Sequence, residues 1–249
     1  PANLKNIDFL NELKAYHADL QIVIAFRMLP ELVWDMPSLG TFNLHASLLP
    51  HYRGAAPINW AIINGETITG VSTFKLKHEI DTGNLLVQKS CAILPEDNAG
   101  TLHDKLMHLG TDAIVETLEQ VLNSELKEIP QHESEEDKNA PKLHPANTEL
   151  QWDRKGSDIV NLVRGLSPYP LAHSTFDHKK MKVYKASFYR EHHTKDIGSF
   201  VTDGKSYLGV WVTDGMVHLD EIKIEGKRQM KIKDFLNGYE ISHLKIKEL

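Results

Sequence analysis

The sequence has 249 residues, of which 41% are hydrophobic and 25% are charged, the composition of an ordinary soluble globular protein. This excludes a fibrous, collagen-like or wholly disordered chain, and no stretch approaches the roughly 20 apolar residues that a transmembrane helix needs. The single cysteine, Cys91, excludes an internal disulfide framework and indicates a reducing compartment such as the cytoplasm. The net charge of −6 is unevenly divided: residues 1–140 hold 10 Lys and Arg against 20 Asp and Glu, whereas residues 141–249 hold 18 against 14.

A more basic half on an acidic chain is typical of a nucleic-acid-binding surface, and a solvated surface of mixed charge is the alternative interpretation. The first residue is Pro1 rather than Met, so the natural chain is expected to begin further upstream. No basic patch followed by an apolar run is visible at the start, so we expect no secretory signal.

The first half of the chain alternates between helical and strand patterns. Runs rich in β-branched residues predict short buried strands, and apolar residues at intervals of three and four predict helices. The predicted helices cover residues 7–17, 57–63 and 101–122, and the predicted strands cover residues 19–26, 41–45, 70–77 and 84–90. This order indicates an α/β fold with a mainly parallel sheet covered by helices.

A change in composition separates the first half from the second. Residues 130–145 are rich in charge and proline and hold almost no large apolar side chains, which is typical of a linker or an extended surface loop. A helix over residues 158–166 follows. The next predicted elements are strands at residues 182–189, 198–203, 207–213 and 216–225 and a helical turn at residues 231–239. Short strands at this spacing predict a small antiparallel β-barrel or sandwich.

The densest cluster of polar side chains follows the strand predicted at residues 41–45. Asn43 and His45 are two residues apart, so both side chains point the same way. Open α/β sheets bind ligands beyond the carboxyl ends of their strands. A donor amide and an imidazole at such a place can hold a carbonyl oxygen and move protons. The alternative is a capping asparagine and a structural histidine.

Asp81 is the second candidate. It lies in the turn EIDTG, between two predicted strands. A carboxylate close to His45 would orient the imidazole and stabilise its charged form. An ordinary turn residue is the alternative, because aspartate is common in tight turns.

Other types of site find no support in the sequence. No spacing of His, Cys and Asp matches a metal site, His192 and His193 included, so we expect no metal. No phosphate-binding loop of the GxxxxGK or GxGxxG type occurs. Ser47 is not in the strand–turn–helix setting of a nucleophilic serine.

Two segments carry a resemblance to a known family. NLHASLLPHYRGAAPINWAIINGETITGVS (residues 43–72) closely resembles the central signature of the folate-dependent formyltransferases, and EIDTGNLL (residues 79–86) resembles their second signature. The segments NLVRGLSPYPLAHSTFD, KVYKAS and GKRQMKIKDFLNGY resemble the carboxyl-terminal domain of the members that formylate methionyl-tRNA.

The resemblance extends over essentially the whole chain and implies its domain organisation. It implies a Rossmann-like formyltransferase domain with a mainly parallel sheet over residues 1–129, a linker over residues 130–142, and an antiparallel, OB-like β-barrel over residues 143–249. The usual family chain begins about 60 residues earlier, the length of two βα units, so the sheet is expected to be incomplete.

The resemblance also implies the activity. This is transfer of the formyl group of 10-formyltetrahydrofolate to the α-amine of methionyl initiator tRNA, in the cytoplasm and by a monomer. Asn43 and protonated His45 would stabilise the oxyanion. Asp81 would set the state of His45 and help to remove a proton from the amine.

The folate-binding residues follow from the same resemblance. The folate site would be formed by Phe26, Arg27, Met28, Leu29, Ser47, Leu48, Leu49, Pro50, Glu79 and Ile80. Arg27 stands where the family usually has glycine. The residues expected to contact tRNA are Arg53 and, motivated by the positive charge balance of the second half, Lys179, Lys180, Lys182, Lys227, Arg228, Lys231 and Lys233, with solvated turn lysines as the alternative.

Two other functions remain open. Formyltransferases that act on an amino sugar nucleotide share the Asn-x-His region, although the LSPYP segment and the GKRQMKIKDFLNGY ending favour the tRNA substrate. A truncated, non-catalytic tRNA-binding module is the alternative outside the enzymes. A formyltransferase acting on glycinamide ribonucleotide is disfavoured, because such enzymes lack the carboxyl-terminal domain.

Overall fold

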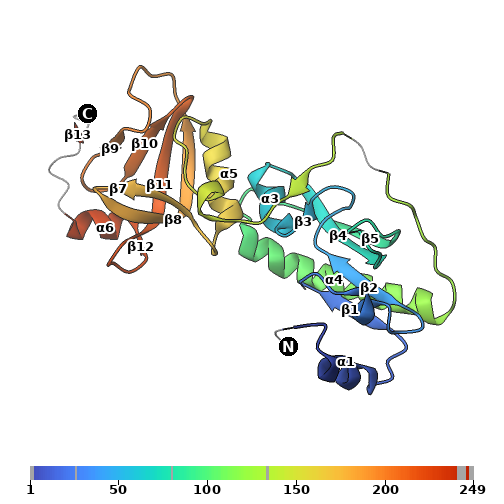
Figure 1. Ribbon diagram of the computed structural model, residues 1–249. Coiled ribbons are helices and arrows are strands. Elements are labelled where there is room, and N and C mark those ends of the chain that lie inside the picture. The colour runs from blue at the N-terminus through green and yellow to red at the C-terminus, as the bar shows by residue number, and fades with distance from the viewer. Residues whose placement is uncertain (1–2, 26, 80, 133–134, 240–244, 247–249) are drawn as a thin grey trace. The chain divides into compact units, whose positions relative to one another are not determined.

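A computed structural model gives the positions of residues 3–25, 27–79, 81–132, 135–239 and 245–246 (Figure 1). Contacts divide the chain into two compact units. Unit 1 comprises Pro1–Pro57, Ile68–Ala92 and His103–Pro141, and unit 2 comprises Ile58–Thr67, Ile93–Leu102 and Lys142–Leu249. Each unit therefore collects segments that are separated in the sequence.

Unit 1 is built on a four-stranded sheet. Its strands, in spatial order, are β1 (Gln21–Ile24), β2 (Thr41–His45), β4 (Ile68–Lys75) and β5 (Leu85–Ala92). The β1–β2 pair is parallel, whereas the β2–β4 and β4–β5 pairs are antiparallel. Residues 76–84, which join β4 to β5, are too few for a parallel crossover, which needs about a dozen residues. The α/β class is confirmed, but the described part of this sheet is mixed rather than mainly parallel.

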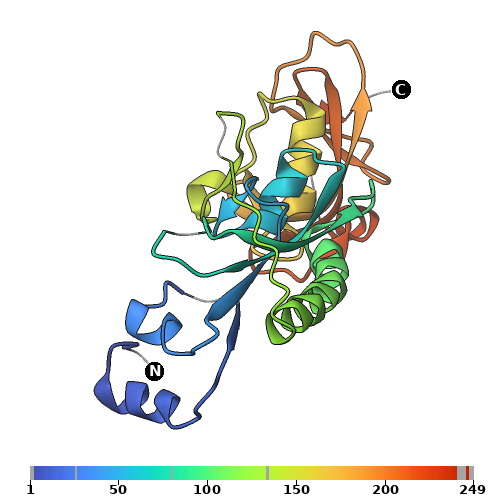
Figure 2. The ribbon, with the colours of Figure 1, turned by 90° about the vertical axis from the view of Figure 1, so that its right-hand side faces the viewer.

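The long helix α4 (Ala99–Leu122) packs on this sheet with its residues from His103 onward (Figures 1 and 2). The hydroxyl groups of Thr117 in α4 and Thr73 in β4 are 2.6 Å apart. A Cβ atom at Gly110 would lie 2.6 Å from the side chain of Leu44, so glycine lets α4 approach β2 closely. Within the residues given above, neither this helix nor any other is long and apolar enough to cross a membrane.

Two shorter helices precede β2 in the chain. α1 (Ile7–Lys14) begins after Asn6, whose side-chain oxygen accepts hydrogen bonds from the backbone amides of Asp8 and Phe9. This is a typical N-cap, and it satisfies amides that have no partner inside the helix. α2 (Glu31–Trp34) is a single turn that follows Pro30.

The segment expected to be a linker is partly held in unit 1. β6 (Asn139–Ala140) pairs in parallel with β3 (Arg53–Gly54). The Ala140 carbonyl accepts hydrogen bonds from the backbone amides of Ala55 and Ala56 at 2.8 and 3.2 Å. Residues 139–140 are therefore fixed against the loop that follows β2. The expected domain limits at residues 129 and 143 stay a prediction.

Unit 2 is built on a second sheet. Its strands are β7 (Ala172–Phe176), β8 (Lys179–Arg190), β9 (Phe200–Thr202), β10 (Leu208–Val212), β11 (Gly215–Ile224), β12 (Met230–Lys231) and β13 (Lys245–Ile246). Their spatial order is β13-β9-β10-β11-β8-β7, with β12 paired to β11. All of these pairs are antiparallel except β13–β9. The antiparallel carboxyl-terminal domain expected from the sequence is confirmed.

The helices of unit 2 come from different parts of the chain. They are α3 (Pro57–Ile63), the 3-10 helix η1 (Pro145–Asn147), α5 (Gly156–Leu166) and α6 (Ile232–Gly238). The Asn59 side chain of α3 donates a hydrogen bond to the carbonyl of Gly165 in α5 at 2.7 Å. The Arg164 guanidinium of α5 donates to the carbonyls of Asp97 and Leu94, both at 2.8 Å. Residues 58–67 and 93–102 are thereby joined to the second sheet and its core.

Candidate active site

Asn43 and His45 lie on β2, which is flanked by β1 and β4 in the sheet of unit 1. Only 4% of Asn43 and 7% of His45 is exposed. Because side chains alternate along a strand, residues two apart point to the same side of the sheet. The strand therefore presents an amide and an imidazole on one side, as their spacing predicts.

The His45 imidazole is oriented by the backbone of Tyr52. The Nε2 atom lies 2.8 Å from the Tyr52 carbonyl oxygen. A carbonyl oxygen only accepts hydrogen bonds, so Nε2 carries a proton whether the ring is neutral or charged. The Tyr52 amide in turn donates to the Lys138 carbonyl, which holds this peptide in place. Nδ1 is therefore the nitrogen that is left to face the rest of the site.

The carboxylate of Asp81 faces this second nitrogen. Its Oδ2 atom lies 3.8 Å from His45 Nδ1 and accepts a hydrogen bond from the Gly54 backbone amide at 3.1 Å. The separation of 3.8 Å is too long for a hydrogen bond but is within the range of an ion pair. With only 11% of its side chain exposed, Asp81 places a negative charge beside Nδ1. Two residues from distant parts of the sequence thus meet at one place.

The Asn43 amide has an atom without a partner. Its Oδ1 atom is buried and makes no hydrogen bond within the part of the chain that the structure describes. Leaving a buried polar atom unsatisfied costs about 1–3 kcal/mol, so such atoms in a folded protein often mark a site of function. The two ends of an amide are told apart only by their partners. The Asn43 amide is therefore available to a ligand.

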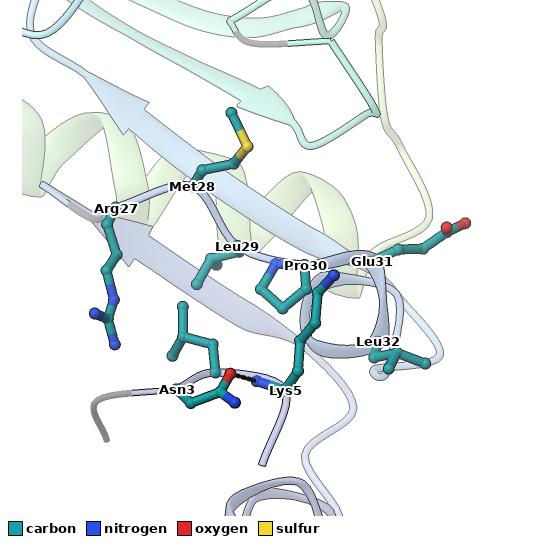
Figure 3. A pocket seen from close by; sticks show the side chains of 9 residues that line it. Asn3, Lys5, Arg27, Met28, Leu29, Pro30, Glu31 and Leu32 are labelled. Carbon is teal, nitrogen blue, oxygen red and sulfur yellow. Dashed lines mark hydrogen bonds between the residues drawn. The ribbon is translucent and has the colours of Figure 1, made fainter.

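Three of the residues expected to bind folate line an open cavity of about 630 Å³ (Figure 3). Arg27, Met28 and Leu29 form part of its wall, together with the amino-terminal residues Asn3–Lys5. In Figure 3 Leu29 points into the cavity and Met28 points away from it. A volume of this size is within the roughly 300–1,000 Å³ usual for small-molecule sites. The other described residues that are expected to bind folate do not line this cavity.

The segment Ser47–Pro50 is packed into unit 1 rather than around this cavity. Ser47 is fully buried, and Leu49 belongs to a small apolar cluster with Phe74 and Leu85. Glu79 is exposed beyond the end of β4. Phe26 and Ile80 lie outside the described residues. The structure thus does not place all the expected folate residues around one cavity.

Apart from Arg53 on β3 of unit 1, the basic residues expected to contact tRNA gather at one end of β11 in unit 2. Lys182 of β8 stands opposite Lys223 of β11, and the Glu225 amide donates to the Lys180 carbonyl at 2.9 Å. Two like charges opposite each other in a sheet are unfavourable unless a counter-charge is bound. The end of β11 is flanked by the start of β8, which carries Lys179, Lys180 and Lys182, and by the following turn and β12, which carry Lys227, Arg228 and Lys231. Lys233 follows on α6.

Sequence reasoning did not find all of these residues. It missed the Tyr52 carbonyl and the Gln131 side chain at the candidate active site of unit 1 and, separately, the Lys223 side chain in unit 2. Arg53, expected to contact tRNA, donates hydrogen bonds to Gln131 instead, a residue 78 positions away in the sequence. A contact over such a separation leaves no local pattern in the sequence. A role of Arg53 toward tRNA stays a prediction.

Metal ligation has no support in this geometry. Among the residues whose positions are given, no group of three or more His, Cys, Asp or Glu side chains is arranged to hold a metal ion.

Comparison with known proteins identifies relatives for both halves of the chain. The sequence profile of the formyl transferase family matches residues 1–118, and that of the formyl transferase carboxyl-terminal domain matches residues 142–240. The methionyl-tRNA formyltransferase of Flavobacterium johnsoniae is 47% identical over 246 residues, which are 97% of this chain and 78% of that protein. The methionyl-tRNA formyltransferase of Parabacteroides distasonis is 49% identical over 248 residues, 96% of this chain and 76% of that protein.

Solved structures of lower identity share the fold. HypX from Aquifex aeolicus, in complex with tetrahydrofolic acid, has a TM-score of 0.68 at 21% identity, and the match covers 93% of this chain but only 41% of HypX. WlaRD, a sugar 3N-formyl transferase, has a TM-score of 0.66 at 18% identity, with 87% of this chain and 77% of WlaRD covered. The profile matches and the relatives more than 45% identical show that the chain belongs to the formyl transferase family.

Proposed function

We propose that the protein transfers the formyl group of 10-formyltetrahydrofolate to the α-amine of methionyl initiator tRNA, for the initiation of translation. The observation that supports this most directly is the His45–Asp81 pair, which lies two residues along β2 from Asn43, whose buried Oδ1 atom has no hydrogen-bond partner among the described residues. The NH₂ group of an amide and a charged imidazole can both donate hydrogen bonds to an oxyanion. The relatives at 47% and 49% identity are named for this substrate.

The first chemical step is addition. A free α-amine has a pKa of about 7.7–8.0, so an appreciable fraction is nucleophilic at neutral pH. Its nitrogen attacks the formyl carbon, a C–N bond forms, and the electron pair of the C=O double bond moves onto the oxygen. The Asn43 amide and the protonated Nδ1 of His45 donate hydrogen bonds to this oxyanion. The Asp81 carboxylate receives the proton that the new ammonium loses.

The second step is collapse. The electron pair returns from the oxygen, and the bond between the formyl carbon and N10 of the folate breaks. The departing N10 takes the proton held by Asp81. His45 keeps its proton throughout, so both residues end in the state in which they began.

The cavity lined by Arg27 and Leu29 supports a folate site in unit 1. Folates combine a flat apolar ring system with the carboxylates of a glutamate tail. The cavity offers the apolar side chains of Leu4, Leu29 and Leu32 beside the cationic side chains of Lys5 and Arg27. This combination suits such a molecule. HypX has been solved with tetrahydrofolic acid and WlaRD in the presence of 5-N-formyl-THF.

The basic end of β11 supports a site for the tRNA backbone in unit 2. Lysines of this kind neutralise phosphates and release counterions, which gives affinity without reading bases. We further propose that the enzyme acts as a monomer in the cytoplasm. The lone Cys91 agrees with a reducing compartment, and light scattering of the purified protein tests the monomer.

A formylation assay with competing acceptors tests the proposal. The full chain is supplied with 10-formyltetrahydrofolate and, in parallel, with methionyl initiator tRNA or a nucleotide amino sugar. Formylmethionyl-tRNA is the expected product, and the matched variant His45→Ala should form it roughly 10²–10⁴ times more slowly. Formylation of the sugar alone would establish the amino sugar function. Binding of tRNA without turnover on either acceptor would establish a non-catalytic module.

A further inference from the structure

The side chain of Gln131 connects two loops that meet at the candidate active site. Its Nε2 atom donates hydrogen bonds to the carbonyls of Asp81 at 2.8 Å and Gly83 at 2.7 Å. Its Oε1 atom accepts hydrogen bonds from Arg53, at 3.2 Å from Nε and at 2.6 Å from Nη2. Gln131 is half-buried and belongs to the segment that the sequence marks as a linker.

Every hydrogen-bonding position of this amide is in use. An amide NH₂ has two donor hydrogens and an amide oxygen has two lone pairs. The orientation is also unambiguous: the guanidinium can only donate and the two carbonyls can only accept. No other side chain of similar size supplies both a double donor and a double acceptor at one end. The contacts therefore require glutamine specifically.

The connection closes a ring around Asp81. Gln131 holds the backbone of Asp81, and the side chain of Asp81 accepts the amide of Gly54, the residue after Arg53. The turn is also pressed against β4, because a Cβ atom at Gly83 would lie 2.0 Å from the Lys75 carbonyl oxygen. Asp81 itself has a positive φ of 57°, a backbone conformation that residues other than glycine adopt infrequently. Such a backbone persists only where its surroundings hold it.

From this ring we infer that Gln131 is a positioning residue for the formyl transfer reaction. By tying the Asp81–Gly83 turn to Arg53, it fixes the Asp81 carboxylate 3.8 Å from His45 Nδ1. The catalytic meaning of this placement rests on the proposed function, but the placement itself does not.

The backbone amide of Gly54 is the spectroscopic probe of this arrangement, because it donates to the Asp81 carboxylate. The full chain is labelled uniformly with ¹³C and ¹⁵N, and the Gly54 resonance is assigned by triple-resonance experiments, because a Cβ atom at Gly54 would lie 2.5 Å from the Ala140 carbonyl oxygen and rules out assignment by substitution. Gln131→Leu and Gln131→Glu are compared with His132→Leu, an exposed neighbour in the same segment. We expect the Gly54 amide to shift and to lose protection from hydrogen exchange in both Gln131 variants and in Asp81→Asn, but not in His132→Leu.

Steady-state kinetics on methionyl-tRNA form the second arm. Misplacing a catalytic group by about 1 Å costs up to roughly 100-fold, so kcat of Gln131→Leu should fall about 10- to 100-fold while KM changes by less than about threefold. In an Asp81→Asn background the same substitution should have no further effect, because residues that act through one another are not additive. A merely structural loss would lower kcat again in that background.

The outcomes separate the two proposals. If the chemical shift and exchange protection of the Gly54 amide are the same in both Gln131 variants as in His132→Leu, the positioning role is overturned. Wild-type kcat in a Gln131 variant, or a further fall in the Asp81→Asn background, would overturn it as well. A wild-type chain that does not formylate methionyl-tRNA would refute the proposed function. The shift and exchange protection of the Gly54 amide would still show whether Gln131 holds Asp81 in place. If Gln131→Leu does not fold, Gln131→Glu, which keeps the acceptors for Arg53, carries both measurements.

Discussion

The imidazole of His45 donates its Nε2 proton to the carbonyl of Tyr52 at 2.8 Å, and Nδ1 is left to face the carboxylate of Asp81 at 3.8 Å. The backbone, rather than another side chain, therefore selects which nitrogen is active. Because Tyr52 is buried and its own amide is hydrogen-bonded, this selection does not depend on the charge of the ring.

Replacement of His45 by Ala should lower kcat by roughly 10²–10⁴, because a donor or proton carrier acts mainly in the transition state. The affinity for folate should change little, since His45 does not line the cavity beside Arg27. Single-turnover formylation and folate titration measure the two quantities. His103→Ala, an exposed position on α4, is the control. A variant within a few-fold of wild type would make His45 a structural residue.

Replacement of Asn43 by Leu should separate activity from stability. The loss of an oxyanion donor is worth about 10²–10³ in kcat. The free energy of unfolding should stay the same or rise by about 1 kcal/mol, because an unsatisfied buried polar atom disappears. Urea unfolding and the formylation assay are run on the same preparation. Lower stability together with full activity would show that Asn43 is a structural residue.

Replacement of Ser72 by Ala should loosen the segment Ser47–Pro50. The buried Ser72 hydroxyl donates to the Ser47 carbonyl at 2.6 Å and accepts from the Leu49 amide at 3.1 Å. Leaving these groups unpaired should destabilise the protein by about 1–3 kcal/mol. If the segment contributes to the folate site, folate affinity also falls. Urea unfolding measures the free energy of unfolding of this variant. The control Ser90→Ala, on the exposed side of β5, should have a free energy of unfolding within about 0.5 kcal/mol of the wild type.

Protonation of the Asp203 carboxylate should make unit 2 less stable at acidic pH. Burial raises the pKa of this carboxyl, but hydrogen bonds from the Ser206 side chain and from the amides of Ser206, Lys205 and Tyr207 outweigh burial and hold the pKa well below its ordinary value. A pKa lowered in the folded state stabilises that state above the ordinary value of about 3.9, and the stabilisation is lost as the pH falls below it.

The difference in Tm between wild type and Asp203→Asn should therefore be largest near neutral pH and shrink as the pH falls below about 4. Thermal unfolding followed by circular dichroism at several pH values measures it. Asp196→Asn, an exposed carboxylate in the same unit, serves for comparison. A difference that stays constant down to pH 2 would contradict the assignment.

Reversal of the charges at Lys182 and Lys223 should weaken tRNA binding and make it less dependent on salt. Each phosphate contact contributes about −0.9 to the slope of log K against log salt, so the slope should flatten by about 2. The full-length double variant Lys182→Glu/Lys223→Glu is compared with Lys195→Glu/Lys205→Glu, an equal change of charge at exposed positions of the same unit. If the two double variants weaken tRNA binding and flatten its salt dependence equally, the change in net charge alone explains the effect.

Elements with a strong local pattern were predictable from the sequence. The strand at Thr41–His45 and the helix at Pro57–Ile63 were expected with the bounds that they have, because β-branched runs, proline and glycine mark their ends. The strand Ala172–Phe176 was missed, since its serine, threonine and histidine hide the alternation of buried and exposed residues. The antiparallel pairing of β2 with β4 joins strands that are not consecutive in the chain and leaves no local pattern, whereas the short connection of residues 76–84 is enough to require that β4 and β5 be antiparallel.

The candidate site divides in the same way. Asn43 and His45 share a strand, so their spacing predicts that they lie together. The Gly54 amide, the Tyr52 carbonyl and Gln131 are brought in by tertiary contacts, and only coordinates reveal them. The opposition of Lys182 and Lys223 depends on the register between two strands, which the sequence does not fix.

The hydrogen bonds from Arg164 to the carbonyls of Leu94 and Asp97 have a consequence for how this chain can be divided. A cut after residue 141 would strip the carboxyl-terminal sheet of α3 and of residues 93–102, leaving the Arg164 guanidinium without these two carbonyls and Ile63 removed from the core around Val163 and Leu166. The carboxyl-terminal half is therefore not an exchangeable cassette. Genetic recombination or protein engineering that swaps it between relatives has to carry the matching pieces of the amino-terminal half along with it.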